Sequence, residues 1–288
     1  MPSLKALRKR ITTVRSTQQI TKAMKMVAAA KLRHAQLAAE RARPYAEKLG
    51  ALLAAVAAGI DPEAPAHPLL ARREARRVDL VVITSDRGLC GGYNANLLRR
   101  AALFVREHPG VEVALTLVGR KGIEHFRRRG AVIVAQRTGI LTTPVGEMAA
   151  ALGASLTTRF ADGETDAVHL VFSRFRSAIA QLPTVVQLLP VAPPATAEDG
   201  SPTDYLFEPT RPVLLDRLLP RYVQTVLTQA LLEAVASEHA ARMTAMENAT
   251  NNATEMIASL TLLMNRTRQA AITKELMEIV SGAEALKG

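Results

Sequence analysis

The residues with the clearest potential for chemistry form the glycine-rich segment VVITSDRGLCGGYNANLL, residues 81–98. A strand, a turn containing Gly88, Gly91 and Gly92, and then a helix is how nucleotide-binding folds present backbone N–H groups to phosphate. The spacing, however, matches neither G-x-G-x-x-G nor G-x-x-x-x-G-K-[ST]. We therefore interpret the segment as a structural turn that allows close packing, with nucleotide binding as the alternative.

Cys90, the only cysteine, lies in this turn and would need a nearby base to act as a nucleophile. The histidines are scattered and show neither H-x-x-x-H nor H-E-x-x-H spacing, so they suggest neither a base for Cys90 nor a metal site. We expect Cys90 to be a packed residue and the protein to hold no metal. A single cysteine also excludes an internal disulfide. The six histidines are His34, His67, His108, His125, His169 and His239.

Four carboxylates could be considered as an acid–base pair. Asp162, Glu164 and Asp166 fall in the polar turn ADGETD before an expected strand, and Asp86 follows another strand. Solvated loop acids are the simpler interpretation. No catalytic constellation remains, and no cofactor is expected.

The basic charge of the chain is concentrated at its start. The net charge is +11, and residues 1–50 hold twelve Lys or Arg against two Glu, whereas residues 242–288 hold five of each sign. The first segment should therefore seek an acidic surface, which could be nucleic acid, lipid headgroups or another protein. A mitochondrial targeting peptide is a fourth alternative. Single-strand binders interleave aromatic residues for stacking, and Tyr45 is the only aromatic in this segment.

Both ends of the chain show the period of a coiled coil. Apolar and small residues recur in alternating steps of three and four. We expect one helix over residues 3–57, ended by Gly59 and Pro62, and another from Pro220 to Gly282, with Pro220 separating it from PVLLDRLL. The expected seams are Leu4, Leu7, Ile11, Val14, Gln18, Thr21, Lys25, Ala28, Leu32 and Ala35 in the first helix, and Met243, Met246, Thr250, Ala253, Ile257, Leu260, Met264, Thr267, Ala271 and Lys274 in the second.

The middle of the chain changes period. Five β-branched runs of strand length alternate with helical stretches between residues 78 and 191. This pattern predicts a Rossmann-like α/β domain of about five mainly parallel strands. The whole chain is then an antiparallel two-helix coiled coil plus that central domain. We expect a coiled-coil helix over 1–60, a linker over 61–77, the α/β domain over 78–208 and a second coiled-coil helix over 209–288. No apolar run approaches the length of a membrane span.

Three separated motifs carry a resemblance over essentially the whole chain. ITKAMKMVAAAKLR near the start, TSDRGLCGGYN in the middle and RQAAITKELMEIVSGAEAL at the end occur in order, together with SEHAARMTAM and DYLFEP. The chain resembles the γ subunits of F-type ATP synthases, of the bacterial type because no presequence precedes the first motif. It lacks the insertion with a cysteine pair that marks chloroplast γ subunits.

The resemblance implies a non-catalytic rotor shaft. Its partners would be three α and three β subunits, the ε subunit and the c-ring, with no nucleic acid and no small-molecule substrate of its own. Proton flow would turn the c-ring and the shaft together and drive the β subunits through their catalytic states, in the synthesis or the hydrolysis direction. The assembled complex would be a proton-transporting two-sector ATPase. The chain would be peripheral on the cytoplasmic side of the bacterial inner membrane.

The resemblance also implies roles for individual residues, position by position. Residues for interaction and coupling are Met24, Lys25, Arg242, Gln269, Thr273 and Glu275. Tyr205 and Glu208, in DYLFEP, would belong to the foot that contacts the c-ring. For several of the coupling residues the alternative is that they only pack the coiled coil.

Overall fold

The computed structural model describes residues 3–58, 67–192, 208 and 210–285 of the chain. These residues divide into two compact units. The helical unit comprises Met1–Val27 and Met243–Gly288, and the α/β unit comprises Ala28–Arg242. Two long helices, α1 (Leu4–Ala58) and α5 (Arg211–Ala285), contribute residues to both units. The predicted domain limits follow these elements rather than the compact units, and they stay a prediction.

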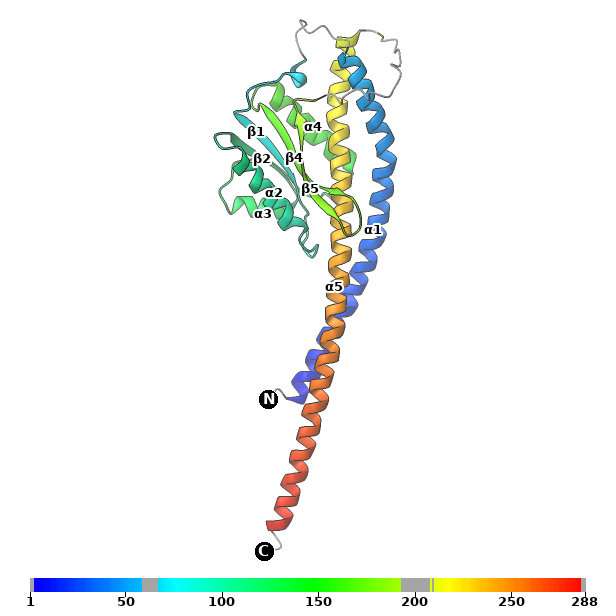
Figure 1. The fold of residues 1–288 in the computed structure, drawn as a ribbon, viewed down its shortest axis with the longest axis vertical. Helices are drawn as coiled ribbons and strands as arrows, with labels where there is room; N and C mark the ends of the chain where they lie inside the picture. Colours follow the sequence, from blue (N-terminus) through cyan, green and yellow to red (C-terminus); the bar gives the residue numbers. More distant parts are fainter. Residues whose placement is uncertain (1–2, 59–66, 193–207, 209, 286–288) are drawn as a thin grey trace. The chain divides into compact units, whose positions relative to one another are not determined.

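The α/β unit is built on one five-stranded sheet with the order β3-β2-β1-β4-β5 (Figure 1). The strands β1 (Arg77–Ile83), β2 (Glu112–Val118), β3 (Ile133–Arg137) and β4 (Ala167–Phe175) run parallel to one another. The edge strand β5 (Gln181–Leu189) is antiparallel to β4. The predicted mainly parallel sheet is confirmed.

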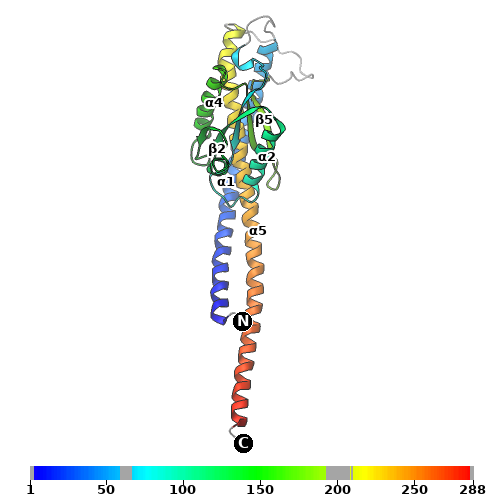
Figure 2. The ribbon, with the colours of Figure 1, turned by 90° about the vertical axis from the view of Figure 1, so that its left-hand side faces the viewer.

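Helices cover both faces of this sheet, as a buried parallel sheet requires. On one face, α2 (Tyr93–Glu107) and α3 (Arg120–Arg127) pack against a core that includes Val78, Leu80 and Val82. On the other face, α4 (Val145–Ala161) and parts of α1 and α5 pack against Val81 and Ile83. Figure 2 shows α2 and α4 on opposite sides of the sheet. A short 3-10 helix, η1 (Pro68–Leu70), precedes β1.

In the helical unit, α1 and α5 pack against each other in opposite directions along the predicted seam. Leu7, Ile11 and Leu260 are buried together, and Val14, Ile257 and Met264 pack against them. The predicted heptad positions are therefore confirmed over this stretch. The last three predicted seam residues, Thr267, Ala271 and Lys274, do not form a seam. Helix α1 begins at Leu4, so the described chain has no turn of α1 opposite them. Lys274 instead pairs with Glu278 of its own helix, at 3.5 Å.

Pro220 does not end a helix, so the predicted break at this residue is wrong. Helix α5 begins at Arg211 and continues through Pro220. A proline in a helix interior costs about 3 kcal/mol, whereas full burial of a Leu or Val side chain contributes roughly 1.5–3 kcal/mol. Leu215, Leu219 and Val223 follow one another at four-residue steps and are at most 2% exposed in the core of the α/β unit. Their combined burial outweighs the cost of the proline.

Candidate functional site

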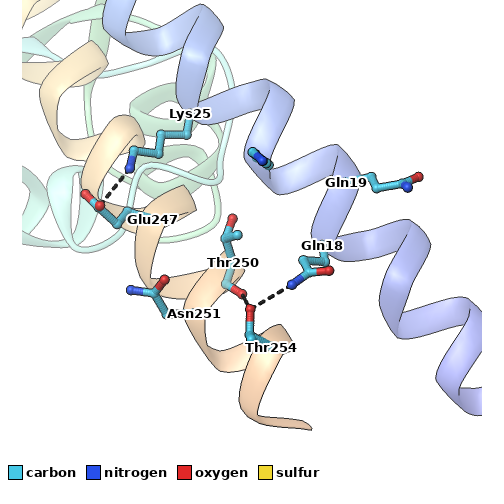
Figure 3. Close-up of a pocket in the computed structure, with 8 residues that line it drawn as sticks. Gln18, Gln19, Lys25, Glu247, Thr250, Asn251 and Thr254 are labelled. Carbon is cyan, nitrogen blue, oxygen red and sulfur yellow. Dashed lines mark hydrogen bonds and ion pairs between the residues drawn. The ribbon is translucent and has the colours of Figure 1, made fainter. Parts of the chain in front are cut away.

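The most distinctive feature of the helical unit is a layer of polar contacts between α1 and α5. Along each helix, the residues that make successive contacts are three or four positions apart, so the layer follows the heptad seam. The three contacts are Gln18 Nε2 to Thr254 Oγ1 at 2.7 Å, Thr21 Oγ1 to Thr250 Oγ1 at 2.8 Å, and Lys25 Nζ to Glu247 Oε1 at 2.6 Å. Figure 3 shows Lys25 and Gln18 reaching from α1 toward α5.

The layer also lines an open groove between the two helices (Figure 3). The residues that line the groove all have polar or charged side chains, and they are Gln18, Gln19, Lys22, Lys25, Glu247, Thr250, Asn251 and Thr254. Hydrogen bonds of this kind contribute only about 0.5–1.5 kcal/mol each, because both partners are well solvated when separated. The layer therefore holds the helices in register without the deep interlocking of an apolar zipper.

Met24, a predicted coupling residue, lies on a different face of α1 from this layer. Ile20, Met24 and Val27 have the i, i+4, i+7 spacing of one helix face. Met24 is half-buried, whereas Ile20 and Val27 are 60% and 57% exposed. This strip of flexible or branched apolar side chains offers a surface for a partner.

The end of α5 presents a second uncovered surface. Gln269 and Thr273 are exposed and share a helix face with Leu276 and Val280, which are each 57% exposed. Glu275 is also exposed. Nothing in the described part of the helical unit covers these side chains. An exposed apolar face of this length indicates contact with another protein.

Arg242, another predicted coupling residue, is buried rather than presented to solvent. Its guanidinium donates to Glu238 Oε1 at 2.7 Å and to the carbonyl oxygen of Gly88 at 3.3 Å. The Glu238 side chain is 1% exposed. Burial raises the pKa of Glu238, and the neighbouring Arg242 guanidinium opposes that rise. Arg242 thus ties α5 to the glycine-rich turn of the α/β unit.

The glycine-rich turn satisfies its own polar groups and supports the structural interpretation. Asn94 Oδ1 accepts from the backbone N–H of Ser85 at 3.0 Å, and Ser85 Oγ donates to the carbonyl of Arg87 at 2.6 Å. Cys90 is 1% exposed, as expected for a packed residue, and burial raises the pKa of its thiol. Leu89 has a φ of 64° and is 65% exposed at the tip of the turn.

Two of the four carboxylates considered as an acid–base pair hold backbone N–H groups of other segments. Asp86 accepts from the backbone N–H groups of Arg120, Gly139 and Ile140 at 2.9–3.1 Å. Asp166 accepts from the N–H groups of Arg76 and Arg77, and it is only 8% exposed, so its interpretation as a solvated loop acid is wrong. Its position before β4 places it beside the first residues of β1, which the sequence does not reveal.

The two remaining acids of this turn stay near its surface. Glu164 pairs with Arg159 at 3.0 Å, and Asp162 is exposed at the end of α4. The described residues contain no group of three or more His, Cys, Asp or Glu side chains placed to hold a metal ion.

Several residues of this site lay outside the sequence predictions. Glu247 and Thr254 are adjacent to predicted seam positions, and the signal for an ion pair is that residues 4–27 of the first helix carry basic residues and no acidic one. Asp79 is fully buried in β1 and pairs with Arg159 of α4, a contact without any local sequence signal. Of the two predicted foot residues, Glu208 is exposed and Tyr205 lies outside the described residues.

Together these features define a class of protein. A basic antiparallel coiled coil with uncovered apolar faces, joined to a Rossmann-like unit whose glycine-rich turn is internally satisfied, is typical of a protein that works through other proteins. None of the described helices has an apolar stretch suited to crossing a membrane.

Comparison of the sequence with known families identifies the family. The profile described as "ATP synthase" matches residues 3–286. The chain is 54% identical over 290 residues to the ATP synthase gamma chain of Anaeromyxobacter sp. (strain Fw109-5), with 100% of both chains covered. It is 49% identical over 287 residues to the gamma chain of Pelotomaculum thermopropionicum, again with full coverage of both. The chain belongs to the gamma-chain family of ATP synthases, and the predicted resemblance is confirmed.

Solved structures agree with this assignment. The central stalk and c-ring structure of the Tetrahymena thermophila mitochondrial ATP synthase contains a chain that is 27% identical, with a TM-score of 0.61 over 80% of this chain and 99% of that one. A chain of the Euglena gracilis mitochondrial ATP synthase is 19% identical, with a TM-score of 0.70 over 98% of this chain and 94% of that one. The second match shows a shared fold.

Proposed function

We propose that this chain is the central rotor shaft of a proton-translocating F-type ATP synthase. It would couple rotation of a membrane c-ring to the conformational cycle of catalytic β subunits during ATP synthesis, and the reverse during hydrolysis. The observation that carries the proposal is the uncovered end of α5, where Gln269, Thr273, Leu276 and Val280 share one exposed face. Such a face requires a surrounding partner, and family membership supports a ring of three α and three β subunits.

The surface chemistry supports rotation within such a ring. A shaft that changes neighbours at every step needs contacts that are favourable but shallow. Methionine side chains adapt to irregular surroundings, and individual dispersion contacts are weak, so a strip such as Ile20, Met24 and Val27 can be released repeatedly. The positive charge of α1 supports attraction to acidic groups of the ring without fixed, desolvated ion pairs, which would be much harder to separate.

The predicted coupling residues divide into two proposed roles. Met24, Gln269, Thr273 and Glu275 would meet the ring directly, because all four are exposed or half-buried on helix faces. Arg242 would act from inside, by fixing the turn whose exposed tip is Leu89. Lys25 is not presented to the ring in the same way, because its ammonium group is bound by Glu247 at 2.6 Å.

The remaining partners and the location are part of the same proposal. Tyr205 and Glu208 would belong to the foot that contacts the c-ring, and an ε subunit would bind the rotor. The chain itself would be non-catalytic, since the internally satisfied glycine-rich turn leaves no evident cradle for phosphate. It would be peripheral on the cytoplasmic side of the bacterial inner membrane.

Reconstitution tests the proposal. The purified chain is mixed with α and β subunits, and the assembled mass and the steady ATPase rate are measured. We expect a stable complex with one copy of this chain per three αβ pairs and a raised ATPase rate. Absence of a complex would contradict the rotor function and return the basic helix to the nucleic-acid alternative, which salt-dependent DNA binding would then test.

A further inference from the structure

One ion pair in the helical unit links the two helices. Lys25 Nζ lies 2.6 Å from Glu247 Oε1, and the side chains are 39% and 46% exposed. Among the residues that the structure describes in this unit, it is the only salt bridge that joins α1 to α5. A charge-assisted hydrogen bond of this length fixes the direction of the ammonium group.

The charges around the pair are strongly one-sided. Residues 4–27 of α1 carry seven Lys or Arg and no acidic residue. The facing stretch of α5, residues 243–264, carries only two ionisable residues, Glu247 and Glu255. Glu247 is the only acid lining the groove, where Lys22 is the second cation. Glu255 is exposed and lies outside the groove.

The direction of the Lys25 side chain determines whether the surface around Met24 presents a free cation or only apolar side chains to a partner. Met24 precedes Lys25 and lies on the exposed apolar strip. A lysine side chain is a flexible four-carbon stem with a strongly hydrated charge at its tip. Once released from Glu247, the ammonium can leave the groove and reach an acidic group on the surrounding ring. A pair formed with the ring at one step would have to break at the next.

We propose that Glu247 is a positioning residue that holds the Lys25 ammonium inside the groove. This level of the rotor then meets the ring through Met24 and its apolar neighbours instead of through a free cation. The inference rests on the proposed rotor function and adds to it a residue that keeps rotation from being slowed by charge.

The test compares four variants in vesicles that carry the whole ATP synthase with each variant of this chain. The readouts are the assembled mass, the ATPase rate and the ratio of ATP-driven proton pumping to ATP hydrolysis, at low and high salt. E247Q releases Lys25. K25Q/E247Q removes both charges, and K25E/E247K reverses the pair. E255Q makes the same charge change as E247Q on the same helix, outside the groove, and is the matched control.

We expect E247Q to assemble normally and to lower the pumping-to-hydrolysis ratio by about two- to fivefold, the factor that an exposed ion pair supports. High salt should relieve part of this loss, because it screens the released charge. K25Q/E247Q and K25E/E247K should restore the ratio, and E255Q should match the wild type.

Two results would overturn the inference. A K25Q/E247Q variant as impaired as E247Q would mean that the ion pair matters only for helix pairing, since that variant lacks the pair but has no free cation. A wild-type ratio in E247Q would mean that Lys25 does not need to be held. Failure of the proposed rotor function would give a different result, because in that case even the wild-type chain would not assemble with α and β subunits.

Discussion

Arg242 and Glu238 form a buried ion pair one helical turn apart in α5, with the guanidinium 2.7 Å from the carboxylate. The same guanidinium donates to the carbonyl of Gly88. Because the Glu238 side chain is 1% exposed, removal of Arg242 leaves a buried charge without a partner. The pair therefore links the stability of the α/β unit to a residue for which we propose a role in coupling.

We expect Arg242→Ala to lower the free energy of unfolding by about 3–5 kcal/mol, the usual cost of breaking a buried pair from one side. The pKa of Glu238, already raised by burial, should rise further without Arg242. Because the folded chain then keeps the Glu238 proton to a higher pH than the unfolded chain does, the free energy of unfolding falls as pH rises through that pKa. The variant should therefore lose more stability at pH 8 than at pH 5, measured by denaturant unfolding. E238Q/R242M, with no buried charge, is the control, and an equal loss in it would contradict this explanation.

His169 and His239 should make the chain sensitive to mild acid. Burial lowers the pKa of both to about 4, with further lowering by His108 for the first and by Arg242 and Lys31 for the second. The unfolded chain, with histidines near 6.5, then binds more protons, so stability is lost as pH falls from 6.5 toward 4. His239→Gln should flatten part of this dependence in a series of unfolding experiments across that range. An unchanged slope would mean that His239 does not contribute to it.

Replacement of Pro220 should stabilise the protein. Pro220 is exposed within α5, where it lacks the N–H for a helical hydrogen bond. We expect P220A to raise the free energy of unfolding by about 1–3 kcal/mol. The thermal midpoint of the full chain measures it, with Pro212→Ala near the start of the same helix as the control. A lowered midpoint in P220A would show that the proline ring makes favourable contacts that outweigh its helical cost.

The threonine pair of the polar layer should be replaceable by apolar residues with a gain in stability. The Thr21 and Thr250 hydroxyl groups lie 2.8 Å apart, so that one donates to the other, and the accepting hydroxyl is free to donate to a carbonyl of its own helix, that of Gln18 or Met246. Replacing both partners removes the polar groups together, so no unsatisfied atom remains. T21L/T250L should raise the free energy of unfolding by about 1–3 kcal/mol through added apolar burial. A loss of stability in denaturant unfolding would indicate that the layer has no room for larger side chains.

Met24→Lys should affect coupling rather than assembly. The new cation would lie on the exposed strip of α1 rather than in the groove that holds Glu247, and residues 4–27 of α1 include no acidic residue to pair with it. We expect normal assembly with α and β subunits and reduced ATP-driven proton pumping per ATP hydrolysed. Met24→Leu, which keeps an apolar side chain, is the matched control. Unchanged pumping in M24K would count heavily against a role of this strip in transmitting torque.

The sequence by itself determined the elements and their order. Heptad spacing predicted the pairing of Leu7 and Ile11 with Leu260, because helical periodicity depends only on local residue order. The five β-branched runs predicted the strands for the same reason, and the three motifs together predicted the family. The spacing of the glycine-rich turn predicted a structural role, which its internal hydrogen bonds support.

The tertiary structure decided which residues meet across the chain. Pro220 continues a helix because the residues around it are buried, which no local propensity reports. Arg242 turns inward to Glu238 and Gly88, Asp166 meets the start of β1, and Lys25 finds Glu247 more than 200 residues away. These contacts depend on how separate elements pack, and burial and charge pairing can override local preference by several kcal/mol. Local periodicity therefore revealed the architecture, whereas the partners of its charged residues depended on the fold.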